Sequence, residues 1–114
     1  MKILLAGLII IHGLIHLLGF VKAFNLGEIS QLTKPIPKPL GLLWLSAAIL
    51  FLTTAGLVLL KKENWPYMGM AAVLLSQLLI VVHWKDAKFG TIANFLILVT
   101  CLLAYGKYHF QSLI

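Results

Sequence analysis

The chain of 114 residues is 61% hydrophobic and only 11% charged, with a formal net charge of +6. A soluble domain carries about 25% charged residues, so this composition excludes a soluble globular domain and indicates an integral membrane protein. The charges lie in short clusters between long apolar runs, which predicts a single transmembrane domain over residues 1–114.

The positive charge comes from lysines, because the sequence contains no arginine. The lysines flank the apolar runs, where such side chains anchor a helix at the lipid headgroups. Nucleic-acid binding needs a basic face with groups that read or stack on bases. We therefore expect membrane lipid as a partner and no nucleic acid. The lysines divide almost equally between the two sides of the predicted bundle, so they do not predict its orientation.

Four apolar runs are long enough to cross about 30 Å of hydrocarbon as helices, at about 1.5 Å per residue. They cover residues 3–21, 40–60, 67–84 and 89–108. The one long connection, residues 22–39, ends in alternating prolines from Lys34 to Pro39. Proline lacks an amide donor and disfavours helix in the residue before it, so we expect an extended strap there.

Short links between the later spans, with Asn64 and Asp86 as expected caps of the third and fourth helices, favour antiparallel neighbours. The predicted fold is an all-α, integral membrane four-helix antiparallel bundle with both termini on one side. The single cysteine, Cys101, excludes an intrachain disulfide and is predicted to be a small buried apolar residue.

The first span carries two histidines four residues apart, His12 and His16, with Gly19 on the same helical stripe. An ionisable side chain at this depth is costly and usually faces the protein interior. One histidine would suffice for a hydrogen bond between helices, so the pair points to a binding or functional role.

The other spans carry sparser polar stripes: Ser46 with Thr53, then either Gln77 or the stripe Gly69, Ala72, Ser76 and His83, then Thr91, Asn94, Cys101 and Tyr105. Counting residues inward from the membrane side of Pro39, Trp84 and Phe89 places one polar side chain of each span in a layer about 8–10 Å deep. These side chains are His16, Ser46, Gln77 and Asn94. His83, Asp86 and Thr91 would form its mouth and His12 its floor. The alternative is that the serine, threonine and amide side chains only bond neighbouring helices.

Three chemistries are open to this polar pocket. A metal site needs three or four ligands, and the candidates are His12, His16 and His83, with Cys101 distant. Bis-histidine haem needs two facing histidines, such as His16 and His83. Binding the polar head of a small lipophile needs only His, Asn and Gln side chains in an apolar pocket, and it fits the residues best.

Three segments also resemble small four-span bacterial membrane proteins of the broadly DoxX-like group. They are His12 to Phe20, Pro39-Leu40-Gly41, and Trp84 to Asn94. The resemblance covers nearly the whole chain and implies a four-helix bundle in the bacterial inner membrane, sometimes linked to redox or quinone systems. It implies no catalytic residues.

We therefore predict an accessory or small-lipophile binding bundle, quinone-like or lipid-like in its ligand, with a site at His12, His16, Asn94, Gln77, Ser46 and His83. It needs no cofactor and no chemistry of its own. A haem- or metal-binding redox subunit and a purely structural membrane subunit are the alternatives. A homo-oligomer or a larger membrane complex is compatible with each.

Overall fold

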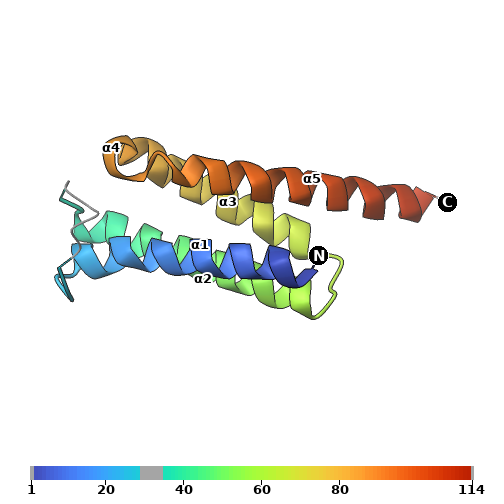
Figure 1. Ribbon diagram of the computed structural model, residues 1–114, viewed down its shortest axis with the longest axis horizontal. Coiled ribbons are helices and arrows are strands. Elements are labelled where there is room, and N and C mark those ends of the chain that lie inside the picture. The colour runs from blue at the N-terminus through green and yellow to red at the C-terminus, as the bar shows by residue number, and fades with distance from the viewer. Residues whose placement is uncertain (1, 29–34, 114) are drawn as a thin grey trace.

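The computed structural model describes residues 2–28 and 35–113, and every regular element in them is helical. The elements are α1 (Lys2–Ala23), α2 (Lys38–Leu59), α3 (Trp65–Val82), α4 (Trp84–Ala87) and α5 (Gly90–Leu113). The predicted all-α four-helix bundle is confirmed. The start of α1 and the end of α5 lie at the same end of the bundle, where the last turns of α5 project beyond the other helices (Figure 1).

Four of the helices are long and apolar enough to cross a membrane, which makes the chain a multi-pass membrane protein. The spans are Lys2–Ala23, Lys38–Leu59, Trp65–Val82 and Gly90–Gln111. Their bounds lie within a few residues of those predicted, because the length of an apolar run is a local property of the sequence.

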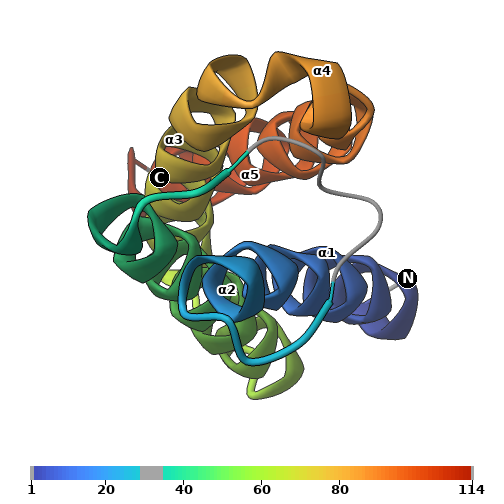
Figure 2. The same cartoon turned by 90° about the vertical axis from the view of Figure 1, so that its left-hand side faces the viewer.

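The four long helices pack in chain order, each against the next, whereas α1 and α5 approach each other over only a short stretch (Figure 2). One buried stripe of α1 explains its close packing. The buried residues follow a three- to four-residue spacing along one face: Ala6, Ile9, His12, Gly13, His16, Gly19 and Ala23.

Small residues bring α1 and α2 together, as is usual where membrane helices pack closely. A methyl group on Gly19 would overlap the ring of Trp44, and one on Gly41 would overlap Cβ of Ala23. Phe51 of α2 is fully buried and would be 2.9 Å (its Cβ) from a methyl group on Gly13. The α1–α2 pair is therefore the tightly packed half of the bundle.

Three local predictions need correction. The strap was expected to run from Lys34 to Pro39, but α2 begins at Lys38, because proline is tolerated in the first turn of a helix. Residues 35–37 lie outside regular structure, and Lys34 lies outside the described residues, as do residues 29–33 of the long connection.

The two expected caps also differ. Asn64 occupies the N-cap position of α3 but makes no side-chain capping bond. Asp86 lies inside α4 rather than capping α5, which begins at Gly90. The chain re-enters helix directly after His83, with the amide of Ala87 bonded to the carbonyl of His83 at 2.9 Å, so α4 takes the place of the expected simple turn.

Candidate functional site

The two histidines of α1 face the interior of the bundle, as predicted. His12 is 5% exposed and His16 is 2% exposed. Their ring centroids lie 4.7 Å apart, and Phe51 of α2 packs edge-on or tilted against both rings at 5.0 and 5.1 Å. Aromatic contacts of this kind hold the imidazoles in defined orientations.

A network of side-chain hydrogen bonds joins α1, α3 and α5 around this pair. Each interhelical hydrogen bond satisfies polar groups that would otherwise be unpaired in the hydrocarbon. The contacts are His12 Nε2 to Asn94 Oδ1 at 2.8 Å, His16 Nε2 to Ser76 Oγ at 2.6 Å, Asn94 Nδ2 to Ser76 Oγ at 3.0 Å, Asn94 Nδ2 to Gln77 Oε1 at 3.1 Å and Gln77 Nε2 to Thr91 Oγ1 at 3.1 Å.

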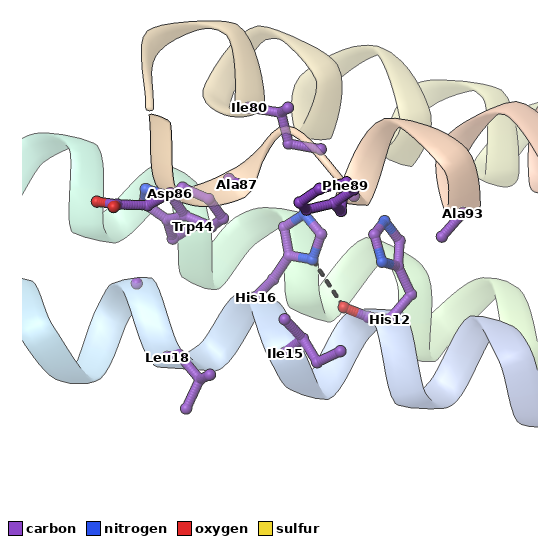
Figure 3. A pocket seen from close by; sticks show the side chains of 12 residues that line it. His12, Ile15, His16, Leu18, Trp44, Ile80, Asp86, Ala87, Phe89 and Ala93 are labelled. Atoms are coloured by element: carbon purple, nitrogen blue, oxygen red, sulfur yellow. Dashed lines mark hydrogen bonds between the residues drawn. The ribbon is translucent and has the colours of Figure 1, made fainter. Parts of the chain in front are cut away.

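A cavity of about 480 Å³ lies beside the histidines, between α1 and the α4–α5 corner. In Figure 3 both imidazoles point from α1 toward this corner, where Phe89 and Ala93 lie. Apolar side chains form most of the wall. The lining residues are His12, Ile15, His16, Leu18, Gly19, Trp44, Ile80, Asp86, Ala87, Phe89, Gly90 and Ala93.

Trp44 forms one end of this cavity and is 4% exposed. Its ring lies 5.2 Å from that of His16 and 5.6 Å from that of His83, so it stands between the two histidines. Within residues 2–28 and 35–113, Nε1 of Trp44 is the one fully buried side-chain nitrogen or oxygen without a hydrogen-bond partner. A buried unpaired donor costs about 1–3 kcal/mol, and because this nitrogen is fully buried it does not open to the cavity.

The structure brings together four of the six predicted site residues: His12, His16, Asn94 and Gln77. His83 is buried behind Trp44, where its Nδ1 contacts the carbonyl oxygen of Leu79 at 3.2 Å. Ser46 lies elsewhere, exposed on the outer face of α2, and its hydroxyl donates to the carbonyl of Leu42 at 2.9 Å.

The expected polar layer was wrong for Ser46, and the expected inward stripe of Ser46 with Thr53 was wrong with it, because both are exposed and the inward threonine of α2 is Thr54. Asn94 bonds to His12, which was expected to form the floor of that layer. A serine or threonine hydroxyl can bond the carbonyl four residues earlier in its own helix. A serine or threonine in a membrane helix therefore does not predict which face of that helix is buried.

The predicted site did not include Ser76, which the sequence placed on one of two alternative stripes of the third span, or Trp44. The signal for Ser76 was its place on the small-residue stripe with Gly69 and Ala72, all of which are buried. The signal for Trp44 was its spacing from Ala47, Ala48 and Phe51, which marks a buried face at i, i+3, i+4 and i+7.

The donor set does not favour a metal or haem site. Within the described segments, no three His, Cys, Asp or Glu side chains are close enough together to hold a metal ion. Both ring nitrogens of His16 are already engaged, Nδ1 with the carbonyl of His12 at 2.7 Å and Nε2 with Ser76. Neither nitrogen offers a free lone pair to a metal in the cavity.

Cys101 is fully buried in α5, as predicted, and lies against Gly69. We expect N-ethylmaleimide to label this thiol at least about tenfold more slowly in the folded, detergent-solubilised protein than in SDS, because reaction requires an accessible thiolate. Mass spectrometry of the labelled protein measures the rate. Lys107→Cys in a Cys101→Ala background is the exposed control. Equal rates for Cys101 with and without SDS would contradict the buried position.

Comparisons with protein-family models, curated proteins and solved structures find no match to this chain. The resemblance to the DoxX-like group therefore stays a prediction, and the function has to be inferred from the geometry of the site.

Proposed function

We propose that this protein binds a small lipophilic molecule, quinone-like or lipid-like in size, in the cavity beside His12 and His16. The observation that carries the proposal is the coincidence of an apolar cavity with a buried polar network. The volume of about 480 Å³ lies in the range of about 300–1,000 Å³ typical of ligand sites. An apolar wall with a few polar side chains is the usual composition of such sites.

Access from the lipid supports the same proposal. Ile15 on α1 and Phe89 before α5 both line the cavity, and they are 52% and 74% exposed. Because these two wall residues are exposed, we propose that the cavity opens to the lipid between α1 and α5. A lipophile dissolved in the bilayer would enter without crossing the headgroups.

A second cavity, of about 470 Å³, lies along the same α1–α5 seam toward the start of α1. Its wall is almost entirely apolar and offers space for an alkyl or isoprenoid chain. The lining residues are Lys2, Leu4, Leu5, Leu8, Phe95, Leu96, Val99 and Thr100. A ligand with its polar head beside His12 could place its apolar tail in this second cavity, between α1 and α5.

The cellular setting belongs to the same proposal. The resemblance to the DoxX-like group would imply the bacterial inner membrane, and four antiparallel spans would leave both termini on one side of it. The protein would act as an accessory or carrier bundle without chemistry of its own, alone, as a homo-oligomer or in a larger membrane complex.

Filling the cavity tests the proposal. Ala93 lines the cavity on α5, whereas Ala71 is exposed on α3. We expect an organic extract of the detergent-purified protein to contain an enriched lipophile by mass spectrometry. Ala93→Phe should lose most of it because the ring occupies the site, and Ala71→Phe should retain it.

The alternatives give different results. An extract indistinguishable from that of an unrelated membrane protein purified in parallel would contradict ligand binding. A lipophile retained equally by Ala93→Phe and Ala71→Phe would mean that it binds the outer surface of the bundle rather than the cavity.

A further inference from the structure

The direction of each hydrogen bond around the histidines can be worked out from one backbone group. Nδ1 of His16 lies 2.7 Å from the carbonyl oxygen of His12. A carbonyl oxygen only accepts, so this nitrogen carries the proton. A neutral imidazole has one N–H, and Nε2 of His16 must therefore accept the hydroxyl proton of Ser76, 2.6 Å away.

The hydroxyl proton of Ser76 is donated to Nε2 of His16 and is therefore not available to a second acceptor. The oxygen of Ser76 can now only accept from Asn94, so the amide nitrogen Nδ2 is the atom at 3.0 Å. The second Nδ2 proton meets Oε1 of Gln77 at 3.1 Å, which is consistent with the same amide orientation. Oδ1 of Asn94 is left facing His12.

His12 must then donate from Nε2 to Oδ1 of Asn94 at 2.8 Å. In the neutral ring its Nδ1 keeps a bare lone pair. This nitrogen has no hydrogen-bond partner among the residues that the structure describes, and it is not among their fully buried unpaired atoms. Because His12 lines the cavity, the group that it presents to a ligand is a hydrogen-bond acceptor.

The reverse direction is unfavourable. If Nδ1 of His12 carried the proton, every bond in the chain would turn around. The lone pair of Nδ1 of His16 would then face the carbonyl oxygen of His12, two acceptors 2.7 Å apart. The backbone carbonyl of one histidine thus sets the tautomer of both rings.

We propose that the ligand in this cavity is a hydroxyl-bearing amphiphile, a phenol, quinol or long-chain alcohol, whose hydroxyl donates a hydrogen bond to Nδ1 of His12. The inference rests on the proposed function and adds the chemistry of the ligand head. A head with carbonyl or ether oxygens alone has no proton to give and would place a lone pair against that of His12. A site built to bond a hydroxyl discriminates against the analogue that lacks it.

Two probes test the inference: 4-nonylphenol and its methyl ether, 4-nonylanisole, in which a methyl group replaces the hydroxyl proton. The ether keeps the chain, the ring and the accepting oxygen. Each is equilibrated with protein-containing nanodiscs and with empty nanodiscs, and the bound amount is measured by mass spectrometry. After subtraction of partitioning into lipid, we expect the phenol to bind roughly tenfold more tightly or better. In His12→Phe the two probes should bind alike.

The possible results separate the two proposals. Saturable and equal binding of both probes to the wild-type protein, or tighter binding of the ether, would overturn the hydroxyl assignment and leave a lipophile site. No binding of either probe above empty nanodiscs would overturn the proposed function together with this inference.

A second measurement holds even if His12→Phe fails to fold. Long-range ¹H–¹⁵N correlation spectra of the labelled wild-type protein report which ring nitrogen carries the proton. We expect His12 to be protonated at Nε2 and His16 at Nδ1. Protonation of His12 at Nδ1 would overturn the assignment without any ligand experiment.

Discussion

Replacing Asn94 with leucine is expected to lower the free energy of unfolding by about 2 kcal/mol, because three interhelical hydrogen bonds at about 0.6 kcal/mol each are lost together. Asn94 is 2% exposed and bonds to His12, Ser76 and Gln77. Leucine has the same number and branching of side-chain heavy atoms as asparagine, so the loss reports on the polar contacts more than on packing. Unfolding in mixed micelles with increasing SDS, followed by tryptophan fluorescence, measures it.

Thr100→Val is the matched control on the same helix. The hydroxyl of Thr100 donates to the carbonyl of Leu96 at 2.9 Å, within α5, so no interhelical bond is lost. The free energy of unfolding should stay within about 0.5 kcal/mol of the wild-type value. If Asn94→Leu and Thr100→Val had the same small effect, the network would contribute nothing to holding α1, α3 and α5 together.

Replacing Gly19 with valine is expected to be the most damaging single change in α1. A Cβ at this position would overlap ring atoms of Trp44, and Trp44 is itself buried and packed against the rings of His16 and His83. Overpacking of this kind costs about 1–3 kcal/mol. The same SDS titration measures the loss, and we also expect ligand binding to fall because Gly19 and Trp44 both line the cavity.

Gly7→Ala and Gly56→Ala are the controls, since a methyl group at either position meets nothing within 4 Å. Alanine is favoured over glycine in a helix interior by about 0.5–1 kcal/mol, so these variants should be slightly more stable than the wild type. The opposite signs separate crowding at the α1–α2 contact from a general effect of replacing glycine. Destabilisation by all three substitutions would contradict the close approach of Gly19 to Trp44.

The hydrogen-bond network around the histidines also explains how a membrane bundle can hold polar groups beside a mostly apolar cavity. Each ring nitrogen of His16 and the Nε2 of His12 are satisfied by the protein itself. Unpaired polar groups in hydrocarbon are costly, and the one ring lone pair of these two histidines that is left over, on Nδ1 of His12, belongs to a side chain that lines the cavity. The site is thereby prepared in advance, with an acceptor on His12 for an incoming ligand.

The sequence alone determined the class of protein, the four spans and the inward face of α1. These depend on local properties: the length of an apolar run, and the spacing of His12, His16 and Gly19 on one helix. A buried imidazole has two ring nitrogens, and its own helix can satisfy only one of them, as the carbonyl of His12 does for His16. The other has to reach a neighbouring helix, so the direction in which the histidines face was predictable.

The rotation of the other helices was decided only by tertiary packing. Ser46 satisfies its hydroxyl on its own helix and faces outward, whereas Ser76 faces inward because Gly69 and Ala72 on the same stripe let α3 approach its neighbours. The cavity likewise arises because α1 and α5, at the two ends of the packing order, make few contacts with each other. The residue pattern within one helix does not predict its distance from a helix that is remote in sequence. The cavity between α1 and α5 could therefore not be predicted from the sequence.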